Sequence, residues 1–129
     1  MKRLFLMLIA ALMTFSVMAV DVPSSTQNPM VAYRLYPTQN TAFFLRLDTR
    51  NGKIDIVQWG TAPGNRFYTT LSDKSLLPSG QDMKPGRFTL YATSHPNILI
   101  LLDQNNGNAW QVQWGLEPDK CALIQIDKQ

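Results

Sequence analysis

The chain has 129 residues, of which 45% are hydrophobic and 16% charged, and this length predicts one domain with a single core. The single cysteine, Cys121, excludes an internal disulfide, so that stability must come from packing. The formal net charge of +3 falls to +1 without Lys2 and Arg3, which gives no reason to expect nucleic acid or an anionic membrane as partner.

The first 19 residues have the three-part layout of a secretory signal peptide. Lys2 and Arg3 form a positive start, residues 4–13 are an almost unbroken apolar run, and small residues precede a cleavage point after Ala19. The apolar run is shorter than the roughly 20 residues that span a bilayer. We therefore predict a secreted or periplasmic location after cleavage near Ala19, with no membrane span in the mature chain.

Short runs of alternating apolar and polar residues follow a polar segment. Residues 20–30 carry two prolines and predict a flexible lead-in. The runs after it are rich in β-branched and aromatic residues, and no window of helical period appears, which predicts an all-β domain. They lie at residues 33–35, 43–47, 54–56, 66–71, 88–90 and 121–127.

The domain contains the same unit twice. Residues 33–60 laid over residues 88–115 give eleven identities in 28 positions at a constant shift of 55, too many for chance. Each copy is predicted to hold three strands, and a fourth strand follows it, at residues 66–71 and 121–127. The repeats therefore span residues 31–71 and 86–127 of a single domain at 31–129. Proline and glycine mark residues 72–85 as the linker.

These repeats predict an antiparallel all-β fold with two pseudo-symmetric four-stranded units. The units could face each other as a sandwich, close as a barrel, or sit side by side like two propeller blades. Each unit would also leave edge strands, through which a homodimer is conceivable.

Each copy has an Asp-x-x-Asn-Gly segment between two strands. Asp48 and Asp103 are predicted to accept hydrogen bonds from loop amides, while Gly52 and Gly107 supply the positive φ of a hairpin loop. A calcium loop is rejected, because oxygen ligands at alternate positions and a closing glutamate are missing. The segments are therefore interpreted as hairpin architecture.

The tryptophans lie on the strand after each hairpin. Trp110, Val112 and Trp114 share one face of the second copy, a pattern typical of a core. Trp59 and Trp114 occur in both copies, and we predict that both are buried. Trp110 stands where the first copy has Asp55, which leaves open an exposed aromatic platform at this position.

The segments YPTQN, FFLRLDTRNGK, VQWG and GRFTLY…ILLDQNNGNAWQVQWG resemble a known group. Small secreted proteins of Bacteroidetes-type bacteria carry repeats of the kind GRFxLYPTxN…LLDxxxGxxWQVQW. The resemblance covers roughly residues 33–115 and implies secretion and a β-repeat architecture, with no established activity. The second copy departs from the pattern at residues 91–95, where YPTQN becomes YATSH.

No constellation of catalytic residues emerges. His95 is the only histidine, and the chain lacks the common hydrolase, zinc and phosphate-loop motifs. Glu117 is the only glutamate, and the repeat-related Asp48 and Asp103 are expected to lie too far apart for a glycosidase pair. We expect Cys121 to be a small strand residue. The prediction is a protein that is not an enzyme and holds no cofactor or metal.

The sequence thus favours a secreted or periplasmic binding module for a glycan, a peptide or a protein. The alternative is a structural or inhibitory protein that acts through a sheet edge or face, and a hydrolase that uses His95 comes third. The candidate ligand-binding residues are Tyr36, Gln39, Asn40, Tyr91, Trp110 and Gln111.

Overall fold

The computed structural model describes residues 30–129, and the predicted signal peptide and nearly all of the lead-in lie outside them. The strands are β1 (Tyr33–Pro37), β2 (Phe43–Asp48), β3 (Ile54–Gln58), β4 (Phe67–Ser72), β5 (Phe88–Ala92), β6 (Ile98–Asp103), β7 (Ala109–Gln113) and β8 (Ala122–Gln125). One-turn 3-10 helices, η1 (Pro63–Asn65) and η2 (Pro118–Lys120), precede β4 and β8. In this part of the chain, no helix has the length and apolar character needed to cross a membrane.

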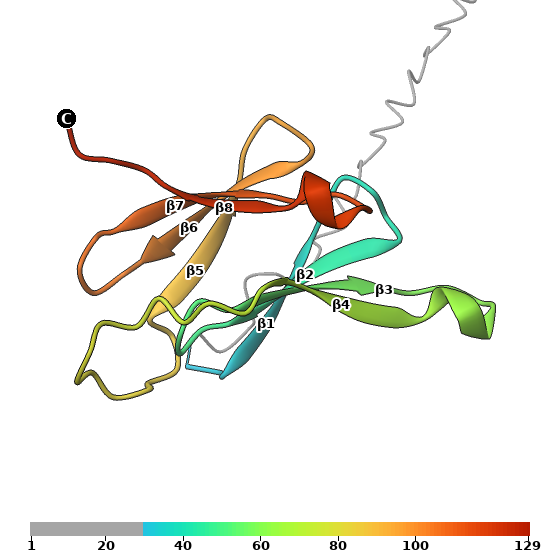
Figure 1. Ribbon diagram of the computed structural model, residues 1–129. Coiled ribbons are helices and arrows are strands. Elements are labelled where there is room, and N and C mark those ends of the chain that lie inside the picture. Colours follow the sequence, from blue (N-terminus) through green and yellow to red (C-terminus); the bar gives the residue numbers. More distant parts are fainter. Residues whose placement is uncertain (1–29) are drawn as a thin grey trace, which may run out of the picture.

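The strands form two antiparallel sheets of order β1-β2-β3-β4 and β5-β6-β7-β8 (Figure 1). Each strand of the second sheet, and η2, begins 55 positions after its counterpart in the first. The repeat therefore includes the fourth strand, although β8 ends at Gln125, before the predicted limit at residue 127. The prediction of an all-β fold with two four-stranded units is confirmed. The sheets do not close into a barrel and pack against each other as in a sandwich.

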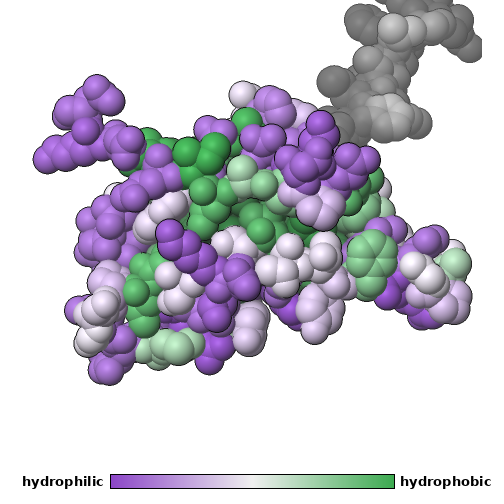
Figure 2. All heavy atoms as spheres, in the orientation of Figure 1, coloured by the Kyte–Doolittle hydropathy of each residue, from purple (hydrophilic) through white to green (hydrophobic). Residues whose placement is uncertain are grey.

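The hydrophobic core lies between the two sheets, where Figure 2 shows apolar side chains gathered. Phe43 on β2 stacks at a tilt against Trp114, with 5.8 Å between ring centroids, and so joins the two repeats. The hydroxyl of Tyr36 on β1 also reaches across, to Thr89 Oγ1 at 3.2 Å. The buried core residues are Phe43, Leu45, Leu47, Ile54, Ile56, Phe88, Leu90, Leu99, Leu101, Trp110, Val112 and Trp114.

The two repeats bury opposite faces of their sheets. On β2, Leu45 and Leu47 are fully buried, but their counterparts on β6, Ile100 and Leu102, are only half-buried. On β6, Leu101 is fully buried instead. Side chains alternate between faces along a strand, so one face of repeat 1 packs on the other face of repeat 2. The contact between the repeats is therefore head to tail rather than symmetric.

The hairpin loops have the predicted architecture. The carboxylate of Asp48 accepts the backbone N–H of Arg50 at 3.0 Å, and that of Asp103 accepts the N–H of Asn105 at 2.9 Å. Gly52 and Gly107 have φ angles of +83° and +80°, a conformation that favours glycine. The structural roles predicted for the aspartates and glycines are confirmed.

Different arginines neutralise the two loop aspartates. In repeat 1, Arg50 Nη2 lies 2.9 Å from Asp48 Oδ2, with the arginine partly exposed, and the hydrogen bond to Asp48 raises the pKa of Arg50. In repeat 2, Arg87 lies one residue before β5 and makes a bidentate pair with Asp103 at 3.0–3.1 Å. The side chain of Asp103 is 0% exposed and that of Arg87 6%, so this second pair is buried in the core.

The segment between the repeats packs on the first hairpin. The backbone N–H of Leu76 donates to the carbonyl of Asn51 at 2.7 Å, and Leu76 and Leu77 pack against the core. At the end of the segment, the N–H of Gly86 donates to Thr49 Oγ1 at 3.0 Å. Thr49 is fully buried and in turn donates to the carbonyl of Val31 at 2.6 Å. One threonine thus ties the start of repeat 1 to the start of repeat 2.

Candidate functional site

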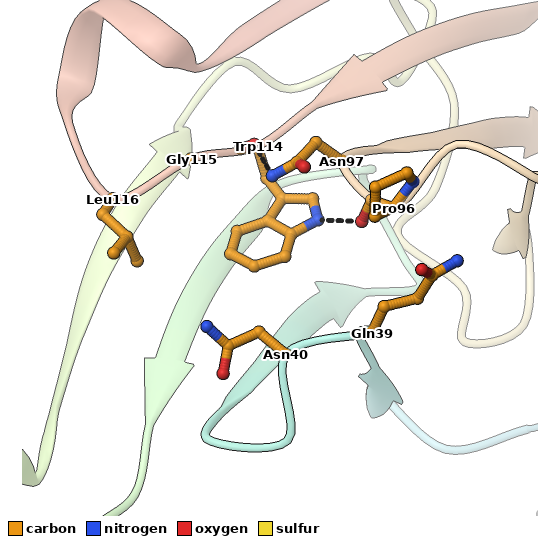
Figure 3. Close-up of a pocket in the computed structure, with 7 residues that line it drawn as sticks. All are labelled: Gln39, Asn40, Pro96, Asn97, Trp114, Gly115 and Leu116. Atoms are coloured by element: carbon orange, nitrogen blue, oxygen red, sulfur yellow. Dashed lines mark hydrogen bonds between the residues drawn. The ribbon is translucent and has the colours of Figure 1, made fainter.

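An open groove of about 520 Å³ lies where the two repeats meet (Figure 3). The loop between β1 and β2 contributes Gln39 and Asn40, which lie across the groove from the indole of Trp114. The wall on the side of repeat 2 is formed by Pro96, Asn97, Trp114, Gly115 and Leu116. Every side chain of this lining is neutral, with amides and apolar groups in nearly equal measure.

Equivalent hydrogen bonds shape the loops beside the groove. Thr38 Oγ1 donates to the carbonyl of Phe43 at 2.8 Å, and Thr93 Oγ1 donates to that of Ile98 at 2.6 Å. These bonds close each loop between its flanking strands. The Asn97 side chain donates to the carbonyl of Trp114 at 3.0 Å and is held in place by it. The side chains that line the groove therefore belong to loops that are fixed by hydrogen bonds.

The tryptophan of each copy makes the same hydrogen bond to the neighbouring loop through its indole N–H. Trp59 Nε1 donates to the carbonyl of Thr41 at 2.7 Å, and Trp114 Nε1 donates to that of Pro96 at 3.2 Å. The prediction that both are buried is correct for Trp114, which is 4% exposed, and wrong for Trp59, which is 54% exposed. Phe43 covers Trp114, whereas the face that carries Trp59 has no sheet against it within residues 30–129.

Trp110 is 8% exposed, so the expectation of an exposed aromatic platform at this position is wrong. Its ring lies 6.3 Å from that of Phe88 and faces repeat 1 with the rest of the core. The residue that it replaces, Asp55, sits on the opposite, outer face of its own sheet. The copies differ here because their equivalent faces have different surroundings.

The remaining predicted site residues separate into three places. Gln39 and Asn40 line the groove, while Tyr36 is half-buried between the sheets. Tyr91 and Gln111 come together on the outer face of repeat 2, where register places both beside Ile100. The sequence prediction missed Asn97 and Leu116. Asn97 immediately precedes β6, in a loop that matches the Gln39–Asn40 loop, and this shared position is the signal that could have identified it.

A charged cluster on the outer face of repeat 1 was also missed. Arg46 Nη2 lies 2.8 Å from Asp55 Oδ2, and its guanidinium lies over the rings of Tyr68 at 4.4 Å and Tyr33 at 5.8 Å. The hydrogen bond to Asp55 raises the pKa of Arg46. The sequence signal is that Arg46 and Asp55, of opposite charge, are cross-strand neighbours. Repeat 2 has the apolar pair Leu101 and Trp110 at the same positions.

His95 and Cys121 have local structural contacts. His95 Nδ1 accepts the backbone N–H of Asn97 at 3.1 Å, which agrees with the interpretation of His95 as a turn residue. Cys121 packs against the core, but it caps η2 one residue before β8, so the expectation of a strand residue is wrong. Within residues 30–129, no three His, Cys, Asp or Glu side chains come together in a way that could hold a metal ion.

Tryptophan fluorescence can check the assignment of the exposed indole. We expect Trp59→Phe to remove most of the acrylamide-quenchable emission, because Trp110 and Trp114 are shielded from solvent. Trp110→Phe, the matched control, should leave the quenchable fraction unchanged. Loss of that fraction in Trp110→Phe, with retention in Trp59→Phe, would contradict the orientation of both strands.

Comparison with protein-family models gives no matching family, and searches of curated proteins and of solved structures give no significant match.

Proposed function

We propose that the protein is a non-catalytic binding module that holds an uncharged polar ligand, such as a glycan, in the groove between its repeats. The supporting observation is the lining: amides from both repeats converge beside apolar surface, with no ionisable side chain among them. Amides both donate and accept hydrogen bonds, which suits the hydroxyl groups of a sugar. A volume of about 520 Å³ lies within the usual range of small-molecule sites.

The hydrogen bonds that fix the loops beside the groove further support a binding role. Asn40 Oδ1 accepts the N–H of Ala42 at 3.2 Å, and the Asn97 amide is fixed on the carbonyl of Trp114, so two of the three amides are already ordered. A site whose side chains are ordered before the ligand arrives loses less entropy on binding. The exposed side chain of Leu116 adds apolar surface for the carbon face of a sugar ring.

Gln39→Ala tests this site with little risk to the fold, because Gln39 is an exposed loop residue. Isothermal titration with a panel of neutral oligosaccharides should identify a binder, and Gln39→Ala should weaken it about two- to tenfold, the effect of one neutral hydrogen bond. Ser94→Ala is the matched control, since Ser94 occupies the equivalent position in the other loop and does not line the groove. Equal effects of both substitutions, or no binding by any neutral sugar, would refute the proposal.

The layout of residues 1–19 supports action outside the cytoplasm as part of the same proposal. N-terminal sequencing of the protein from an expressing bacterium would find Val20 first if the leader is removed as predicted. An intact Met1 would refute export through this segment.

A further inference from the structure

Each repeat has an outer face that the other repeat does not cover. The outer face of repeat 1 contains Leu35, Phe44, Arg46, Val57 and Trp59, and the outer face of repeat 2 contains Ile98, Ile100, Leu102 and Ile124. Exposed apolar faces of this kind mark interaction surfaces. Figure 2 shows hydrophobic side chains at the surface over β8, at the margin of the second of these faces.

The two outer faces correspond to the two surfaces that already pack against each other inside the molecule. At the shift of 55, Ile98, Ile100 and Leu102 are the counterparts of Phe43, Leu45 and Leu47, which form the buried face of repeat 1. In the same way, Leu35, Val57 and Trp59 are identical to Leu90, Val112 and Trp114, which form the buried face of repeat 2. The chain therefore presents one half of its own internal interface at each end.

Burial in the internal interface shows what a partner would do to these residues. Leu35 is 48% exposed and its counterpart Leu90 is 4% exposed; the corresponding values for Trp59 and Trp114 are 54% and 4%. The residue types are the same, and only the covering sheet differs. A second sheet whose face resembles the buried face of repeat 1 would bury Leu35 and Trp59 to the same extent if it packed on the outer face of repeat 1.

We infer that copies of this chain associate head to tail, with the outer face of repeat 2 of one copy on the outer face of repeat 1 of the next. Ile98 then covers Trp59, as Phe43 covers Trp114 within one chain. The centre of the contact is more polar than the internal one, because Arg46 and Asp55 replace Leu101 and Trp110. This pair is neutralised internally at 2.8 Å, and the amide of Gln111 on the opposing face supplies a further hydrogen-bonding group.

A contact between two different faces either closes a ring or continues as a filament. Sequential four-stranded meanders that pack face to face are the blades of β-propellers, in which about four to eight sheets close around an axis. Since each chain supplies two sheets, this geometry corresponds to rings of about two to four copies. The association concerns the outer faces, so it is independent of ligand binding in the groove.

Sedimentation velocity of the purified full chain over a wide concentration range tests the inference. We expect a reversible species of two or more copies, and a blue shift of the emission of Trp59 as it forms. Leu35→Glu and Ile100→Glu should each yield monomers where the unchanged chain is assembled. Leu35 faces Arg46 across the strands, so a glutamate there is compatible with the fold. Met83→Glu, an equally exposed apolar residue of the inter-repeat segment, should leave assembly unchanged.

Mixing the two face variants distinguishes a head-to-tail contact from a symmetric one. Each variant keeps one intact face, so an equimolar mixture of Leu35→Glu and Ile100→Glu should form a 1:1 dimer and nothing larger. If Ile100→Glu does not fold, judged by circular dichroism, Ile124→Glu on the same face replaces it, because Ile124 is 51% exposed. A chain that stays monomeric at every concentration, or a mixture that stays monomeric, would overturn the inference. So would assembly that survives Leu35→Glu.

Discussion

Replacing Arg87 with alanine is expected to lower the free energy of unfolding by about 3–5 kcal/mol, the usual cost of breaking a buried ion pair. The variant would leave the carboxylate of Asp103 fully buried without its counter-charge. Since domains of this size are stable by only about 5–15 kcal/mol, the loss would remove a large share of the total. Urea denaturation followed by circular dichroism measures it.

Arg50→Ala is the matched control, because Arg50 forms an ion pair with Asp48 as Arg87 does with Asp103. The side chains of Arg50 and Asp48 are 29% and 9% exposed, against 6% and 0% for Arg87 and Asp103, so water can replace more of the interaction that is lost. The urea midpoint of Arg50→Ala should therefore fall much less than that of Arg87→Ala. Equal shifts for the two arginine variants would contradict the burial of the second pair.

Truncations at equivalent positions of the two repeats are expected to lower the free energy of unfolding by unequal amounts. On one face of the sheet the larger loss falls in repeat 1, and on the other face it falls in repeat 2. Leu45→Ala should cost about 2–5 kcal/mol, the range for a leucine in a well-packed core, and Ile100→Ala clearly less. On the other face the order reverses: Val112→Ala should cost more than Val57→Ala, although residue and repeat position are the same. These differences follow from full burial of Leu45 and Val112 against half-burial of their counterparts.

The four variants are best compared by urea denaturation at low protein concentration, so that association between chains contributes nothing. A symmetric contact between the repeats would bury the same face in both copies. It would then give Leu45 and Ile100 similar values, and likewise Val57 and Val112. That result would contradict the head-to-tail packing on which the inference of assembly rests.

Local patterns in the sequence predicted the strands, the duplication and the hairpin loops, because each depends on neighbouring residues. Asp48 and Gly52 act within a single turn, and the alternation along β2 reflects one strand. The sequence repeat also contained more than was used: Pro63 and Pro118 are identical at the same shift and start the two 3-10 helices.

Burial of the tryptophans could not be predicted in this way, because it depends on which sheet covers which face. Trp59 and Trp114 occupy the same position, make the same indole hydrogen bond and differ only in what lies above them. Similarly, the groove exists only where the loop with Asn40 meets the wall of repeat 2, a meeting that no local pattern encodes. A duplicated sequence predicts equal structure in its copies, but it does not predict equal environment.

The meander order of both sheets also has a consequence for how fast the chain folds. Every strand pairs only with its neighbour in sequence, so all backbone ladders grow from local hairpins, which form in about 1–10 μs in isolation. Within each sheet the contact order is low, and low contact order accompanies fast folding. Only the docking of one sheet on the other joins segments 53 residues apart, such as Tyr36 and Thr89. The loop-closure entropy of folding is therefore concentrated in a single docking step, which makes that step the expected kinetic barrier.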